Sequence, residues 1–145
     1  MASVGTIAAA DPQMQNLAKQ LRVLNGQPSL LDITIAQLNT LISTDQASIV
    51  SNLAQIATLN TQIAARTDAL IAGGATSPDV VADPQCLTLG AQITGFLAMN
   101  DNFTRHITQI QALIDGQTAQ LANLPAQQAA IADLLAARLD VLRGI

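Results

Sequence analysis

The sequence predicts an all-α fold: a long antiparallel helical hairpin, coiled-coil-like, with a short N-terminal helix and a C-terminal helix that is kinked or broken at a proline. Three observations predict it. Aliphatic side chains recur about every 3.5 residues from Leu31 to Leu70, and the same spacing returns from Ile93 to Ile145. A turn-forming segment joins the two stretches. Two periodic stretches of similar length with a short connection favour two helices that fold back on each other.

The N-terminal residues divide into a short arm and the start of a helix. Residues 1–10 are small and apolar and are expected to form a flexible arm. They lack the basic residues that precede the apolar stretch of a signal peptide. Residues 11–145 are expected to form a single helical domain. Its first helix begins with Asp11 as N-cap and Pro12 at the first helical position, where the missing N–H costs nothing.

The first helix is predicted over residues 12–25, and the long second helix over residues 29–72. Asn25 and Gly26 supply a stop signal, and Pro28 is incompatible with a continuous helix. We call the apolar line of the hairpin the seam, since a 3.5-residue repeat keeps one stripe facing a partner helix. On the second helix the seam consists of Leu31, Ile35, Leu38, Ile42, Asp45, Ile49, Asn52, Ile56, Leu59, Ile63, Arg66 and Leu70.

The connection is predicted as a loop over residues 73–83, because Gly73 and Gly74 stop a helix and Ser, Pro and Asp follow. Asp83 and Pro84 repeat the Asp-Pro signature of the first helix, so the next helix is expected over residues 84–124. Pro125 then kinks or breaks it, with a last helix over residues 125–143. The second line of the seam is Ile93, Phe96, Asn100, Phe103, Ile107, Ile110, Ile114, Gln117, Leu121, Leu124, Gln128, Ile131, Leu135, Arg138, Leu142 and Ile145.

Three polar residues interrupt the seam of the second helix and are the candidate functional residues. Asp45, Asn52 and Arg66 replace aliphatic side chains, and a buried polar group without a partner costs about 1–3 kcal/mol. They are expected to meet one another or water. Either they fix the register and the oligomeric state, as a seam Asn does in coiled coils, or the seam opens to solvent there. Ile49 and Ile56 are the apolar candidates for assembly, and replacement of Asn52 by Ile is expected to raise stability.

No catalytic, cofactor-binding or metal-binding residue is predicted, and an enzyme is not expected. His106 is the only histidine and lacks a neighbouring nucleophile and orienting carboxylate in sequence. Cys86 falls in the first turn of a helix, where a small hydrophobic role is favoured over a reactive thiol. The chain has no Glu and no Tyr, so few acid and base groups are present. No cofactor and no small-molecule substrate is expected.

Composition and charge argue against nucleic acid and membrane as partners. Ten acidic and six basic residues give a net charge of -4, which offers no attraction to phosphate backbones. The longest uncharged window, residues 46–65, carries too many polar side chains for a transmembrane helix. Amphipathic lipid binding is disfavoured because the polar faces lack Lys and Arg. We therefore expect a soluble protein without signal peptide or transmembrane segment.

The missing surface charge suggests a function. Only 11% of the residues are charged, against about 25% in ordinary globular domains. In this respect the composition resembles that of helical virion proteins of bacteriophages, such as capsid-associated or fibre-like subunits. The leading hypothesis is a non-enzymatic structural subunit that packs by helical hairpins against copies of itself or other assembly proteins, with a phage virion as one such assembly. The alternative is a small helical interaction module, either a secreted hairpin or an adaptor bundle.

Overall fold

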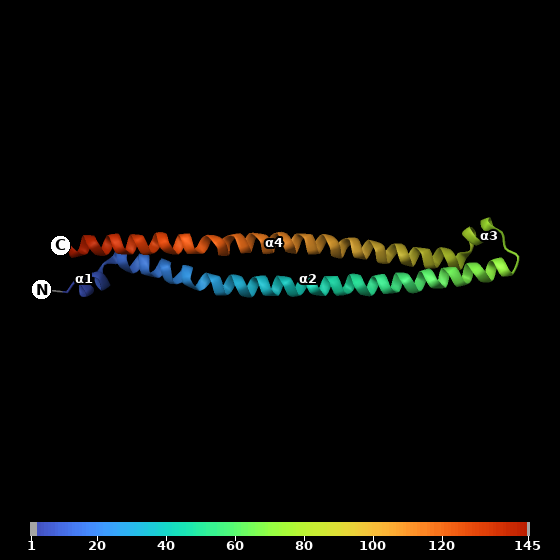
Figure 1. The fold of residues 1–145 in the computed structure, drawn as a ribbon, viewed down its shortest axis with the longest axis horizontal. Coiled ribbons are helices and arrows are strands. Elements are labelled where there is room, and N and C mark those ends of the chain that lie inside the picture. The colour runs from blue at the N-terminus through green and yellow to red at the C-terminus, as the bar shows by residue number, and fades with distance from the viewer. Residues whose placement is uncertain (1–2, 145) are drawn as a thin grey trace. The chain divides into compact units, whose positions relative to one another are not determined.

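The computed structural model describes residues 3–144, and this part of the chain is helical except for short connections, without strands. Its elements are α1 (Val4–Ala10), α2 (Pro12–Ala72), α3 (Ser77–Ala82) and α4 (Pro84–Arg143). The two long helices α2 and α4 pack against each other (Figure 1). The predicted all-α helical hairpin is therefore confirmed, and both Asp-Pro pairs mark the starts of helices as expected, although the helix that begins at Pro12 is long and not short.

The chain forms two compact units, and each contains one segment of α2 and one of α4. Unit 1 comprises residues 1–38 and 112–145, and unit 2 comprises residues 39–111. Within each unit the two segments run antiparallel: in unit 1, Asp11 bonds to Arg138 and Leu24 to Gln128. In unit 2, Asp45 bonds to His106 and Arg66 to Asp83. Segments far apart in the sequence thus form each unit.

The buried apolar side chains follow the 3.5-residue spacing in both units. A helix pair buries only one stripe of each helix, so the rest of each surface stays exposed. The buried set is Leu17, Ile114, Leu124 and Leu142 in unit 1 and Ile42, Leu59, Leu89 and Ile110 in unit 2. Ile145, the last predicted seam position, lies outside the described residues.

The predicted break between residues 25 and 29 is wrong, because α2 runs from Pro12 to Ala72 with Pro28 inside it. Leu17, Leu21 and Leu24 are in the same seam phase as Leu31 and are buried or half-buried like the positions that follow. Packing of this continuous stripe offsets the backbone hydrogen bond that proline removes. The Asn25–Gly26 stop signal is overridden for the same reason.

Three further boundaries differ from the prediction. A break at Pro125 is wrong, since α4 continues through it to Arg143. The arm is helical from Val4 to Ala10, where the Ser3 hydroxyl accepts a hydrogen bond from the Thr6 N–H at 3.1 Å. Met1 and Ala2 lie outside the described residues. Residues 4–10 therefore form a helix, and the predicted flexible arm is wrong for these residues.

The predicted loop contains the short helix α3. α2 ends in a Schellman motif, in which the N–H of Ala75 bonds to the carbonyl of Leu70 and Gly74 has φ of 91°. The Asp79 carboxylate then accepts hydrogen bonds from the Thr76 N–H at 2.9 Å and hydroxyl at 2.8 Å. These bonds hold the first turn of α3, so turn-forming residues make a helix here.

Candidate functional site

Asp11 joins the start of α2 to the end of α4 in unit 1. Its carboxylate accepts a hydrogen bond from the Met14 N–H at 2.9 Å, so it caps α2 as predicted. The same carboxylate receives two hydrogen bonds from the Arg138 guanidinium, at 3.0 and 2.6 Å. Arg138 is the main cause that lowers the pKa of Asp11, ahead of the Met14 N–H. We call this bidentate contact the Asp11–Arg138 clamp.

Asp83 makes the equivalent contact at the start of α4 in unit 2. Its carboxylate accepts from the Cys86 N–H at 3.0 Å and from the Arg66 guanidinium at 3.2 and 2.9 Å. Asp83 is buried, and the hydrogen bond from Arg66 is the first cause that lowers its pKa to about 2. Bidentate Arg–carboxylate contacts are geometrically specific. This second contact, the Arg66–Asp83 clamp, fixes where α4 begins relative to the end of α2.

Asp45 is paired with His106 across the two helices of unit 2. The His106 ring nitrogen Nδ1 lies within hydrogen-bond distance of the Asp45 carboxylate. The Asp45 side chain is 12% exposed, whereas the His106 side chain is 51% exposed. The imidazole thus covers a buried carboxylate from the rim of the seam, and no nucleophile lies in this pair.

Asn52 pairs with Asn100 in the interior of the same seam. The Asn52 amide nitrogen donates to the Asn100 side-chain oxygen at 2.8 Å. The two residues are 8% and 9% exposed, so both amides are removed from water. Each is satisfied only while the two helices keep this alignment, which makes the pair sensitive to register.

The four cross-helix pairs oppose a slip of the helices by one heptad. Such a slip would place Asn52 opposite Ile93 or Ile107 instead of Asn100. It would also move Asp45 from His106 to Met99 or Leu113. Each slipped alignment buries polar groups against apolar side chains, which is costly. Asp45, Asn52 and Arg66 do not meet one another, which was one of the two expectations. Each meets a polar residue of α4 or its N-cap, and for Asn52 this is the seam residue Asn100.

The predicted residues therefore take part in two kinds of contact. Asp45, Asn52 and Arg66 form polar pairs, and Ile49 and Ile56 lie half-buried on the seam between them. Sequence reasoning missed their partners His106 and Asp83, since pairing depends on the register of the hairpin. A usable signal was present: the Gly73–Gly74 stop and the Asp83 cap together set the residues that face each other.

A metal site and a reactive thiol each set requirements for the remaining His, Cys and Asp side chains. No group of three or more His, Cys, Asp or Glu side chains in the described part of the chain could hold a metal ion. Burial is the main cause that raises the pKa of the Cys86 thiol, which disfavours the nucleophilic thiolate. Among residues 3–144 no helix is long and apolar enough to cross a membrane.

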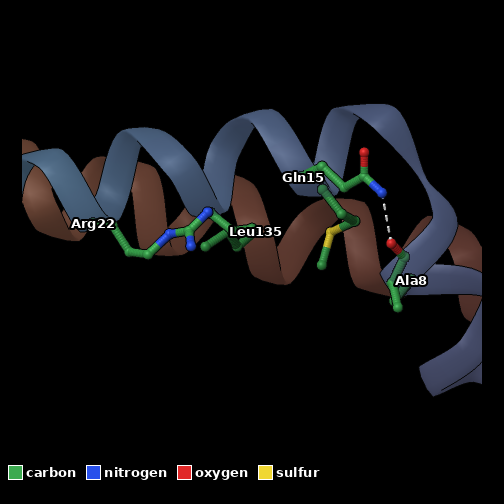
Figure 2. A pocket seen from close by; sticks show the side chains of 7 residues that line it. Ala8, Gln15, Arg22 and Leu135 are labelled. Atoms are coloured by element: carbon green, nitrogen blue, oxygen red, sulfur yellow. Dashed lines mark hydrogen bonds between the residues drawn. The ribbon is translucent and has the colours of Figure 1, made fainter.

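A shallow groove lies beside α1 in unit 1, with a volume of about 450 Å³. Figure 2 shows Arg22 and Leu135 along it and Gln15 at its end near α1. The Gln15 amide donates to the Ala9 carbonyl at 2.8 Å and so ties the end of α1 to α2. The other lining residues are Ala8, Ala9, Met14 and Ala18, so the groove offers one cation and no acid or base pair.

Comparisons with protein families, with curated proteins and with solved structures find no match to this chain.

Proposed function

We propose that this protein is a non-enzymatic structural subunit that assembles through an uncharged part of its surface. We call this part the neutral segment, and it consists of residues 46–65 of α2 and 84–100 of α4. Neither stretch contains an Asp, Glu, Lys, Arg or His. The observation that carries the proposal is that the two stretches face each other in unit 2.

Three contacts give the alignment of the two stretches. The Asn52–Asn100 pair lies in the neutral segment at the last residue of its α4 stretch, and the Arg66–Asp83 clamp closes one end of the segment. The Asp45–His106 pair lies just beyond the other end. Residues 52–65 of α2 and residues 84–100 of α4 therefore face each other without an ionic group on either helix, whereas residues 46–51 face the segment after Asn100, which carries Asp101, Arg105 and His106. A solvated helix pair of this length ordinarily carries mixed charges.

The neutral segment also exposes apolar side chains and a groove. Val50, Leu53, Leu87, Leu97 and Met99 are between 46% and 66% exposed. A groove of about 370 Å³ runs between the helices. Its lining is Gln55, Leu59, Gln92, Gly95, Phe96 and Met99. Depletion of charge with exposed aliphatic and Met side chains is typical of surfaces that become the centre of a protein interface.

Burial of these exposed apolar side chains against another protein would contribute about 25 cal/mol per Å² of apolar area. The partners are other copies of this chain or other assembly proteins, and a virion lattice is one assembly that such a subunit suits.

Light scattering on the purified protein tests the proposal. We expect large species whose mass grows with concentration, and we expect V50K to reduce them to small species with helicity retained. L30K is the matched control, since Leu30 is 64% exposed and Val50 66% exposed, but Leu30 lies outside the neutral segment. A monomer or dimer at all concentrations would favour a helical interaction module. Equal effects of V50K and L30K would exclude the neutral segment as the assembly surface.

A further inference from the structure

The chain contains two similar segments, offset by 72 residues in sequence. Ala10-Asp11-Pro12-Gln13 recurs as Ala82-Asp83-Pro84-Gln85, and Ala64-Ala65-Arg66 recurs as Ala136-Ala137-Arg138. Nineteen of the 64 residues from Ala10 to Gly73 are identical to the residue 72 positions later. A shared seam period would align aliphatic residues, but it would not align Asp-Pro-Gln or Ala-Ala-Arg. We call the segments repeat 1 (residues 10–73) and repeat 2 (residues 82–145).

The structure pairs the repeats reciprocally at their most similar residues. Arg66 of repeat 1 binds Asp83 of repeat 2, and Arg138 of repeat 2 binds Asp11 of repeat 1. In both clamps the Asp also caps the long helix of its own repeat, through the N–H of Met14 or Cys86. Each repeat thus contributes one capping Asp and one Arg, and each of these residues binds its counterpart in the other repeat. Reciprocity of this kind is the rule in twofold-symmetric homodimers.

The two interior pairs do not follow this reciprocity. At the 72-residue offset, Asp45 of repeat 1 corresponds to Gln117 of repeat 2, and His106 of repeat 2 corresponds to Thr34 of repeat 1. In the same way, Asn52 corresponds to Leu124, and Asn100 corresponds to Pro28. Each interior pair is therefore present once, whereas the clamp is present twice.

We propose that the chain arose by duplication of a helix that paired with a second copy of itself, and that the two interior pairs now select the partner. The clamps alone permit three pairings: α2 with α4, α2 with α2 of another copy, and α4 with α4. In an α2–α2 pairing, Asp45 would face Thr34 and Asn52 would face Pro28. In an α4–α4 pairing, His106 would face Gln117 and Asn100 would face Leu124. Only α2 with α4 satisfies both interior pairs, so unmatched pairings bury amides and a carboxylate without their partners.

The proposal is tested by folding the whole chain, cutting it between its two long helices, and measuring which helices pair again. A site-specific protease sequence inserted after Gly74 allows α1–α2 to be separated covalently from α3–α4 after folding. The cleaved protein is unfolded in urea and refolded, and native mass spectrometry then counts the two homodimers and the heterodimer. For the wild-type residues we expect the heterodimer alone.

Substitutions at the interior pairs should change this choice. The variant D45Q/H106T/N52L/N100L uses the matched residues Gln and Thr for one pair and Leu for the other. We expect both homodimers to appear, at fractions approaching random pairing. The control R66M/R138M removes the shared clamps. It should lower the refolded yield and still give the heterodimer alone.

Two results would overturn the proposal. One is a mixture of all three dimers from the wild-type residues. The other is a heterodimer alone from the fourfold variant. If that variant does not refold, N52L/N100L decides the matter, because it replaces the amides with apolar side chains and leaves the Asp45–His106 pair intact. Homodimers should then appear at a smaller fraction, and their absence would contradict a role of the Asn pair in partner choice.

Discussion

The side-chain amide of Gln128 donates a hydrogen bond to the backbone carbonyl of Leu24, at 3.3 Å. Leu24 lies four residues before Pro28, so this carbonyl is the acceptor that proline leaves without a backbone donor. The same amide also reaches the Asn25 side-chain oxygen at 3.0 Å. A residue of α4 thus supplies what α2 lacks at Pro28, which is one reason why α2 continues where the sequence predicts an end.

Replacement of Gln128 should therefore lower the free energy of unfolding appreciably only when Pro28 is present. We expect Q128L to lower the free energy of unfolding by about 1 kcal/mol, the usual value of a hydrogen bond. In a P28A background, where the backbone N–H is restored, the same substitution should have a much smaller effect. Urea unfolding of the four proteins measures the coupling, with Q127L as the control at an exposed neighbouring position. Equal effects of Q128L in both backgrounds would show that Gln128 does not compensate for the hydrogen bond that Pro28 removes.

The buried Asn pair predicts opposite effects for single and double substitution. N52L leaves the Asn100 amide buried without its partner, and we expect it to lower the free energy of unfolding by about 1–3 kcal/mol. N52L/N100L replaces the pair by apolar side chains and should be more stable than N52L, and at least as stable as the wild type. This revises the expectation that an aliphatic residue at position 52 alone raises stability. Thermal unfolding followed by circular dichroism tests it, and a stabilising single substitution would show that Asn100 finds another partner.

Acid should weaken the fold through the clamps. The pKa of Asp83 is about 2 in the folded chain, below its ordinary value of 3.8, with the Arg66 hydrogen bond as the first cause. The folded state therefore binds this proton less tightly than the unfolded state. The stabilisation is complete above about pH 4 and is lost as the pH falls through about 2. The lowered pKa of Asp11 acts in the same direction.

Comparison of the wild type with D83N isolates this contribution. The melting temperature of D83N should be lower than that of the wild type at pH 6, and the two should converge as the pH approaches 2. A difference that stays constant over this range would mean that ionised Asp83 does not stabilise the fold.

Gly95 predicts a substitution that separates folding from assembly. A Cβ added at Gly95 meets no atom within 4 Å, and the residue lines the groove of the neutral segment. We expect G95L to retain or increase helicity, since Gly is a poor helix former, and to reduce the assembled mass in light scattering. G116L is the matched control, because Gly116 is equally open but lies in unit 1. Assembly of G95L at the wild-type level would show that no partner enters this groove.

The periodic features of the fold could be predicted from the sequence, because a 3.5-residue apolar repeat is a local signal that specifies a packed helix. The Asp-Pro starts and the Gly73–Gly74 stop are local as well. The continuity of α2 through Pro28 was not predictable by these rules, since it depends on Gln128, which is far away in sequence. Local proline and glycine signals are overridden where the partner helix supplies both packing and a hydrogen-bond donor.

Only the α2 side of the candidate site could be predicted fully from the sequence, for a related reason. Asp45, Asn52 and Arg66 are recognisable as polar interruptions of an aliphatic stripe. Asn100 is recognisable in the same way on the second line of the seam, but the partners His106 and Asp83 are not, because His106 lies beside the seam and Asp83 lies before α4 begins. Which of them meet follows from the register, and the register follows from the turn after α2 and from the clamps.

Electron microscopy of the 145-residue chain, as wild type and V50K, tests most directly whether the neutral segment builds an assembly. We predict ordered particles such as rings, rods or shells for the wild type, and their loss in V50K while circular dichroism still reports the helices. Uniform small particles from the wild type at every concentration would contradict a structural subunit that assembles through this surface.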